Sequence, residues 1–167
     1  DTDAMLEAAA ANDWIKGVVG WIPLMHPAKA ALALECYGKN PYFKGVRHLI
    51  HDEADPKWLL QPAVIESLQL IANAGLTYDL VGVKDEHLDT LLEVLQKLPG
   101  LKVVLDHLNQ PPISKGLGWG RWADLIKELS FNQHVYAKVS GLGATSAKGA
   151  SWTENDVLRS VEFALKH

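Results

Sequence analysis

The sequence contains a single cysteine, no long apolar run and no excess of basic residues. Cys36 cannot form a disulfide within the chain, which fits a reducing compartment. No run approaches the roughly 20 apolar residues that a helix needs to cross a bilayer. Lys and Arg total 16 against 20 Asp and Glu, a net charge of −4, so no basic face for nucleic acid is expected. These absences favour a cytoplasmic protein that acts on small molecules, with no nucleic-acid or membrane partner and an undetermined oligomeric state.

Familiar metal and nucleophile motifs are also missing. The chain has no His-x-His, His-Glu-x-x-His or paired-cysteine pattern. His48 and His51 are three residues apart and would project to opposite faces of a strand, so they cannot bind one ion unless the strand ends between them. Ser140 lacks the first glycine of the Gly-x-Ser-x-Gly motif. We therefore expect no complete metal site from these residues. The cofactor is unknown, and a divalent metal such as zinc is left open without being required.

What the sequence does contain is a regular alternation of two hydrophobic patterns. With 48% apolar residues over 167 positions, the chain is long enough for one full core and too short for two comfortable domains. Short β-branched runs alternate with longer segments that carry apolar residues three and four positions apart. Strands are expected at 16–22, 45–50, 77–81, 102–107 and 135–140. Helices are expected at 3–11, 28–36, 62–75, 88–98, 122–129 and 153–165.

The expected strands recur about every 30 residues, which is the length of one unit of a (β/α)8 barrel. Apolar strands joined by helical crossovers predict a parallel sheet, so the fold class is α/β. Doubly wound open sheets share this local pattern, and the period alone does not separate the two. Five strands cannot close a barrel, and the chain begins and ends inside helical patterns. We therefore expect either an open sheet or a piece of a longer barrel.

Polar side chains gather where the expected strands end. In parallel α/β sheets, ligands bind beyond the carboxyl ends of the strands. The polar residues at these positions are Arg47, His48, Asp79, Asp106, His107, Lys138 and Ser140. Each of them could instead cap a helix or pair with a neighbour, so the pattern indicates a candidate site without assigning its chemistry.

His107 has the most informative surroundings. Strand alternation places it on the face of Val103 and Leu105, opposite Asp106. If Leu105 faces the interior of the sheet, His107 points into the mouth of a site. There an imidazole can polarise a carbonyl, move a proton or hold a metal. The alternative is a core histidine that is bonded to a backbone carbonyl.

Six segments, taken in order, resemble one known family. They are residues 17–21, 45–48 (Gly-Val-Arg-His), 52–60, 78–80, 104–108 (with Leu-Asp-His-Leu) and 138–142 (with Lys-Val-Ser-Gly). Together they resemble the sugar-acid lactonase branch of the amidohydrolase superfamily. That branch holds L-fuconolactone and L-rhamnonolactone hydrolases and is related to 2-pyrone-4,6-dicarboxylate hydrolase. The resemblance implies a TIM-type (β/α)8 barrel of which the third to seventh units are present, so that residues 1–167 form a single partial barrel domain.

The resemblance also implies roles for individual residues. His107 resembles the family's active-site histidine, and Arg47 the arginine that grips the substrate's polar oxygens. Asp79, the one matched carboxylate able to activate water, completes the expected catalytic set, although either Asp79 or its neighbour could face inward. The expected substrate-binding residues are His48, Tyr78, Lys138 and Ser140. The family's first-strand His-x-His and eighth-strand aspartate have no counterpart here, and Asn109-Gln110 replaces its usual Gly-Lys.

These residues predict a hydrolase that opens a sugar-acid lactone or a related cyclic ester by water attack on the carbonyl. A lactone is an activated cyclic ester, and its tetrahedral intermediate needs hydrogen-bond donors for the growing oxyanion. Arg47 and His107 could supply them. Two alternatives stay open: a non-catalytic or incomplete barrel fragment, and a metal-dependent decarboxylase of the same superfamily.

Overall fold

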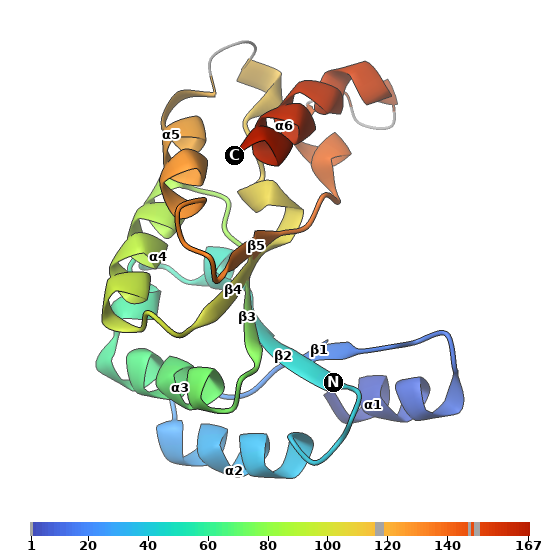
Figure 1. Cartoon of the computed structure of the whole chain (residues 1–167), viewed down its shortest axis with the longest axis vertical. Coiled ribbons are helices and arrows are strands. Elements are labelled where there is room, and N and C mark those ends of the chain that lie inside the picture. The colour runs from blue at the N-terminus through green and yellow to red at the C-terminus, as the bar shows by residue number, and fades with distance from the viewer. Residues whose placement is uncertain (1, 116–118, 147, 149–150) are drawn as a thin grey trace.

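A sheet of five parallel strands forms the centre of the computed structural model, which describes residues 2–115, 119–146, 148 and 151–167 (Figure 1). The strands are β1 (Val18–Gly20), β2 (Phe43–His48), β3 (Thr77–Leu80), β4 (Lys102–Leu105) and β5 (Val135–Ala137). Neighbouring strands pair in parallel throughout. The five expected strands and the α/β class are thereby confirmed, although β1 and β5 are shorter than their apolar runs.

Helices flank every strand. They are α1 (Thr2–Ala11), α2 (Pro27–Tyr37), α3 (Pro62–Asn73), α4 (Asp85–Lys97), α5 (Gly120–Leu129) and α6 (Glu154–Lys166). Pro62 occupies the first turn of α3, where its missing N–H leaves no helical hydrogen bond unmade. Thr153 and Asp156 form a capping box at the start of α6, as the sequence predicts. Within the described ranges, no helix is both long enough and apolar enough to span a membrane.

The strands lie across the sheet in the order β1-β2-β3-β4-β5. A doubly wound sheet reverses its strand order at a switch point, and this sheet has no such reversal. The sheet is curved, and the helices follow one another along its outer side (Figure 1). Winding in one direction with helices on one side is the pattern of a (β/α)8 barrel. The five strands therefore form an arc of such a barrel rather than an open doubly wound sheet.

The face of the sheet that lies against the helices holds the apolar core. Its members come from alternate positions of the strands and are at most 2% exposed: Val46, Tyr78, Leu80, Val103 and Leu105. The helices contribute long apolar stripes to the same core, such as Leu88, Leu91 and Val94 on α4. Removing this much apolar surface from water is the main stabilising contribution to the fold.

The opposite, concave face carries the intervening residues of the same strands. Arg47 on β2 is paired with Asp79 on β3, and Asp79 is paired with Val104 on β4. Paired residues of parallel strands share a face, so all three side chains point to the concave side. Leu105 lies on the helix side, and strand alternation alone therefore does not explain how His107 reaches a site.

Gly45 on β2 is a sensitive point of the sheet, because its neighbour on β3 leaves little room for a side chain. A Cβ atom at this position would lie 2.8 Å from the carbonyl oxygen of Thr77. We expect Gly45→Ala to lower the free energy of unfolding by about 1–3 kcal/mol through overpacking, as measured by urea denaturation.

Gly100→Ala is the matched control for this prediction. Apart from its chain neighbours, no described atom lies within 4 Å of the Cβ position at Gly100. Its substitution should change stability by less than about 0.5 kcal/mol. Equal stabilities for the Gly45→Ala and Gly100→Ala variants would contradict the packing described for β2 and β3.

Candidate active site

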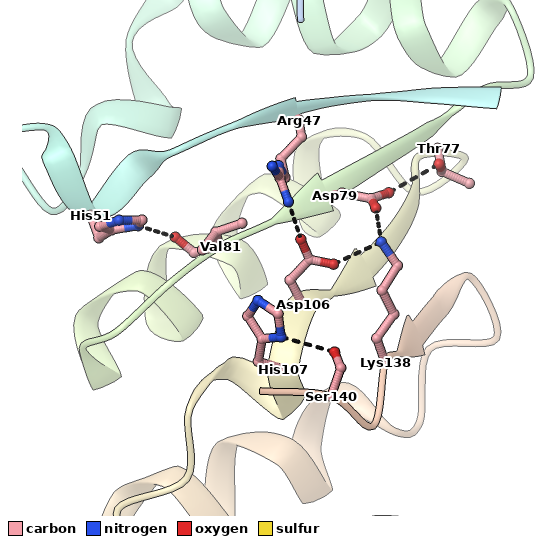
Figure 2. Close-up of polar contacts among 9 residues, drawn as sticks. All are labelled: Arg47, His51, Thr77, Asp79, Val81, Asp106, His107, Lys138 and Ser140. Carbon is pink, nitrogen blue, oxygen red and sulfur yellow. Dashed lines mark hydrogen bonds and ion pairs between the residues drawn. The ribbon is translucent and has the colours of Figure 1, made fainter. Parts of the chain in front are cut away.

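A chain of ionic contacts lies on the concave face, at the carboxyl ends of the strands (Figure 2). The Asp106 carboxylate, directly after β4, lies between two cations. Arg47 Nη1 is 3.3 Å from its Oδ2, and Lys138 Nζ is 2.8 Å from its Oδ1. Lys138 Nζ also donates to Asp79 Oδ2, and Thr77 Oγ1 donates to Asp79 Oδ1 at 3.2 Å. Side chains on β2 and β3 thereby meet side chains that directly follow β4 and β5.

The two carboxylates of this cluster are buried, whereas the two cations are half exposed. Asp79 and Asp106 have side-chain exposures of 1% and 2%, against 45% for Lys138 and 47% for Arg47. Burial removes the hydration of a carboxylate, and without a nearby cation this loss is not compensated. Asp79 and Asp106 therefore both depend on their cationic partners. Burial lowers the pKa of Lys138, but its contacts with Asp106 and Asp79 outweigh burial and raise that pKa above its ordinary value of 10.5.

The chain makes an unusual left-handed turn directly after Asp106. All four residues at 107–110 have positive φ angles, between 51° and 58°. Residues other than glycine adopt this conformation at a cost of roughly 1–2 kcal/mol each. Two contacts hold the turn: the Leu108 N–H donates to the Lys138 carbonyl at 3.1 Å, and Trp122 Nε1 donates to the Leu108 carbonyl at 2.9 Å. Strained backbone of this kind is concentrated at functional sites.

The turn breaks the strand alternation and sets the position of His107. Its Nδ1 lies 2.8 Å from Ser140 Oγ, beyond the end of β5 (Figure 2). Gly141 lies against the ring, because a Cβ atom there would be only 2.7 Å from Nδ1, and its φ of 64° also favours glycine. His107 and Arg47 therefore lie at the same edge of the sheet, since Arg47 contacts Asp106, the residue that precedes His107.

Two of the expected substrate-binding residues lie apart from this cluster. Tyr78 is fully buried on the helix side of β3, where burial raises the pKa of its hydroxyl. The structure does not bring Tyr78 to the concave face, because alternation along β3 turns its neighbour inward instead. His48, at the end of β2, has both ring nitrogens engaged: Nε2 lies 2.7 Å from Glu53 Oε1, and Nδ1 accepts a hydrogen bond from Trp21 Nε1 at 3.3 Å.

Asp79 is the inward-facing residue of β3, but its carboxylate is not open to a substrate. One oxygen accepts from Thr77 and the other from Lys138, and the side chain is 1% exposed. A general base must reach the proton that it abstracts. In this geometry Asp79 supports Lys138, and its expected role in activating water stays a prediction.

Asp106 is the central residue that the sequence did not assign to a role. It contacts both cations of the cluster, yet strand alternation put it on the face opposite His107. The signal that could have found it lies in the spacing. Asp106 is two positions beyond Val104, which shares the face of Asp79, so a residue at this position continues the concave face.

The described residues do not form a metal site. Among them, no three His, Cys, Asp or Glu side chains come together in a group that could hold a metal ion. The two buried carboxylates at the site are already engaged by Lys138 and Arg47. His51 does not join His48 in a ligand pair, since its Nδ1 contacts the Val81 carbonyl at 3.2 Å (Figure 2). These residues alone therefore do not fit a divalent cation.

Comparison with known proteins gives consistent matches along the chain. The family model described as Amidohydrolase matches residues 1–167. The L-fucono-1,5-lactonase of Burkholderia ambifaria is 30% identical over 154 residues, which cover 92% of this chain and 49% of that protein. The L-rhamnono-gamma-lactonase of Scheffersomyces stipitis is 29% identical over 136 residues, 74% of this chain and 38% of that protein. The chain thus spans about half the length of the curated relatives it matches.

Solved structures share the fold. A crystal structure of an amidohydrolase from Burkholderia multivorans with bound HEPES matches with a TM-score of 0.87 at 24% identity, covering 99% of this chain and 59% of that one. A second crystal structure from the same source, with bound zinc, gives a TM-score of 0.86 over the same shares of both chains. The five-stranded arc is therefore also found in larger proteins of known structure.

The carboxylate cluster predicts that Lys138 stabilises the fold. Lys138→Met leaves two buried carboxylates without their shared cation, and we expect the free energy of unfolding to fall by about 1–3 kcal/mol, less than for a fully buried pair because Lys138 is half exposed. Since the folded-state pKa of Lys138 is raised, its contribution is fully present below pH 10.5 and is lost as the pH rises through that raised pKa. Urea denaturation of both proteins at pH 8 and above pH 10.5 measures this.

The control for this prediction is Lys39→Met. Lys39 pairs with Glu35 one helical turn away, and both side chains are more than 70% exposed. Loss of this pair should lower stability by no more than about 0.5 kcal/mol. An effect of Lys138→Met as small as that of Lys39→Met, or one that does not shrink at high pH, would contradict the ionic account of the cluster.

Proposed function

The chain belongs to the amidohydrolase family, and on this premise we propose that it carries active-site residues of a hydrolase that opens sugar-acid lactones. The names of its relatives, L-fucono-1,5-lactonase and L-rhamnono-gamma-lactonase, support this substrate class. The observation that carries the proposal is the meeting of Arg47 and His107 at one edge of the sheet, through Asp106. A half-exposed guanidinium and an imidazole at the carboxyl ends of the strands, where ligands bind in barrels of this type, support the proposal.

Arg47 serves the carbonyl oxygen of the lactone. Attack of water on the carbonyl carbon moves negative charge onto this oxygen, and a fixed donor stabilises that charge more than it stabilises the substrate. The guanidinium is oriented before substrate arrives, because Nη1 contacts the buried Asp106 carboxylate. A donor in such a position typically lowers the barrier by about 3–4 kcal/mol.

His107 moves the proton of the reaction. In our proposal Ser140 Oγ accepts from Nδ1–H, which leaves Nε2 unprotonated and able to accept a proton from the attacking water. The water oxygen then bonds to the carbonyl carbon. When the bond between the carbonyl carbon and the ring oxygen breaks, the proton returns from Nε2 to that ring oxygen as it becomes a hydroxyl. The ring-opened hydroxy acid is the single product.

Lys138 contributes to substrate binding in addition to holding the carboxylates. An ammonium group has three N–H donors, and Asp79 and Asp106 account for two of them. The third can donate to a hydroxyl of the sugar acid, because the Lys138 side chain is 45% exposed. Ser140 acts in this proposal through His107, by fixing its tautomer. We also infer a cytoplasmic location, with which the single cysteine Cys36 agrees, and a part in carbohydrate metabolism, which the names of the relatives support.

Turnover of a panel of aldonolactones by the full-length protein tests the proposal. We expect hydrolysis of at least one sugar-acid lactone, and a fall in kcat/KM of at least about 100-fold in Arg47→Ala and in His107→Ala, because each loses a group that acts in the transition state. The far-ultraviolet circular dichroism of both variants should match that of the parent protein.

Matched controls come from residues of the same type away from the site. Arg121 pairs with Asp89 between α4 and α5, and His134 directly precedes β5, at the amino edge of the sheet. Arg121→Ala and His134→Ala should retain parental kcat/KM. Normal turnover in both Arg47→Ala and His107→Ala would refute the proposed roles, and no lactone hydrolysis by the parent protein would refute the proposed function.

A further inference from the structure

The ring of His48 is held on three sides. Trp21 Nε1 is a donor only, so His48 Nδ1 must accept its hydrogen bond at 3.3 Å, and the ring proton therefore lies on Nε2. Nε2–H donates to Glu53 Oε1 at 2.7 Å. The imidazole also stacks on the buried indole of Trp58, with 4.3 Å between ring centroids and 6° between planes. With both nitrogens engaged, His48 is arranged to hold Trp21 rather than to contact a substrate.

Trp21 lies at the same edge of the sheet as Arg47. Gly20, the last residue of β1, is paired with Val46 on β2, so Trp21, directly after β1, lies level with Arg47. The backbone of Trp21 is fixed by Thr2, whose hydroxyl accepts from the Trp21 N–H at 2.9 Å and donates to the Trp21 carbonyl at 3.1 Å. Trp21 is therefore fixed both at its backbone and at its indole nitrogen.

Trp21 nevertheless remains accessible, with 53% of the residue exposed. An accessible indole that is held by its N–H presents a large, rigid apolar surface at little entropic cost. The C–H groups on one face of a sugar ring form an apolar patch that fits such a surface, while the hydroxyls at the ring edge remain free for hydrogen bonds. Binding pockets combine apolar walls with a few polar groups in this way.

We propose that Trp21 is a specificity-determining residue that packs against the C–H face of the lactone ring, and that His48 is a positioning residue that holds the indole in place. This inference rests on the proposed lactone hydrolysis. It assigns His48 an indirect part in substrate binding, in place of the direct contact expected from the sequence. Glu53 and Trp58 act one step further away, because they fix the ring of His48.

Steady-state kinetics of the full-length protein with L-fucono-1,5-lactone tests this inference. Trp21→Ala should raise KM roughly 5- to 50-fold and change kcat less than about 3-fold, because the packing is similar in the ground and transition states. Trp21→Phe retains a smaller aromatic face and should give an intermediate KM. This second variant also keeps the test decisive if Trp21→Ala folds poorly.

His48 variants test the positioning role. His48→Ala should also raise KM. In the double variant that combines His48→Ala with Trp21→Phe, the fold-increase in KM should be smaller than the product of the two single fold-increases, because both substitutions act on one contact. His48→Gln offers an amide oxygen to the indole N–H and should restore much of the parental KM. A purely structural role for His48 would instead lower thermal stability equally in both His48 variants without this recovery of KM.

Trp14→Ala is the matched control. Trp14 is 74% exposed and lies in the segment that leads into β1, toward the amino ends of the strands and away from the site. Its KM should equal that of the parent protein. An unchanged KM in Trp21→Ala and Trp21→Phe, together with loss of turnover in Arg47→Ala, would overturn this inference and leave the proposed function standing. Absence of lactone hydrolysis by the parent protein would overturn both.

Discussion

The buried carboxylate of Asp106 is the constraint on which the site depends. A carboxylate that is 2% exposed is tolerated only beside opposite charges, and here they come from other strands: Lys138 follows β5 and Arg47 lies on β2. Each cation is thereby held at the end of β4, next to His107. The same ion pairs therefore neutralise the buried carboxylate and bring the ligand-facing groups together. The half-exposed cations are oriented before a ligand arrives.

Much of the fold could be predicted from the sequence, because the core demands a regular pattern. Val46 and Leu105 belong to apolar runs that mark buried strands, and the capping pair of Thr153 and Asp156 marks the start of a helix. The hydrophobic pattern alone could not predict the direction of winding, which only the resemblance to a barrel family indicated. This direction depends on which strand lies beside which, and the local pattern is the same for a barrel and for a doubly wound sheet.

The candidate site was predictable in part. Arg47 and His107 stand out in the sequence as polar residues at the ends of apolar strands. The central position of Asp106 depends on register, and the orientation of His107 depends on four left-handed residues, none of them glycine, which leave no signature in the sequence. The proposed positioning role of His48 depends on contacts of its ring with Trp21 and Glu53, which are 27 and 5 residues away in the chain.

A crystal structure of the full-length protein with the acid formed by opening L-fucono-1,5-lactone tests the central claim most directly. We expect a carboxylate oxygen of this product to lie within about 3.2 Å of the Arg47 guanidinium, and the new hydroxyl group to lie within about 3.2 Å of His107 Nε2, with the contact between Arg47 and Asp106 retained. A product bound away from both side chains, with Asp106 turned from Arg47, would rule out the proposed arrangement.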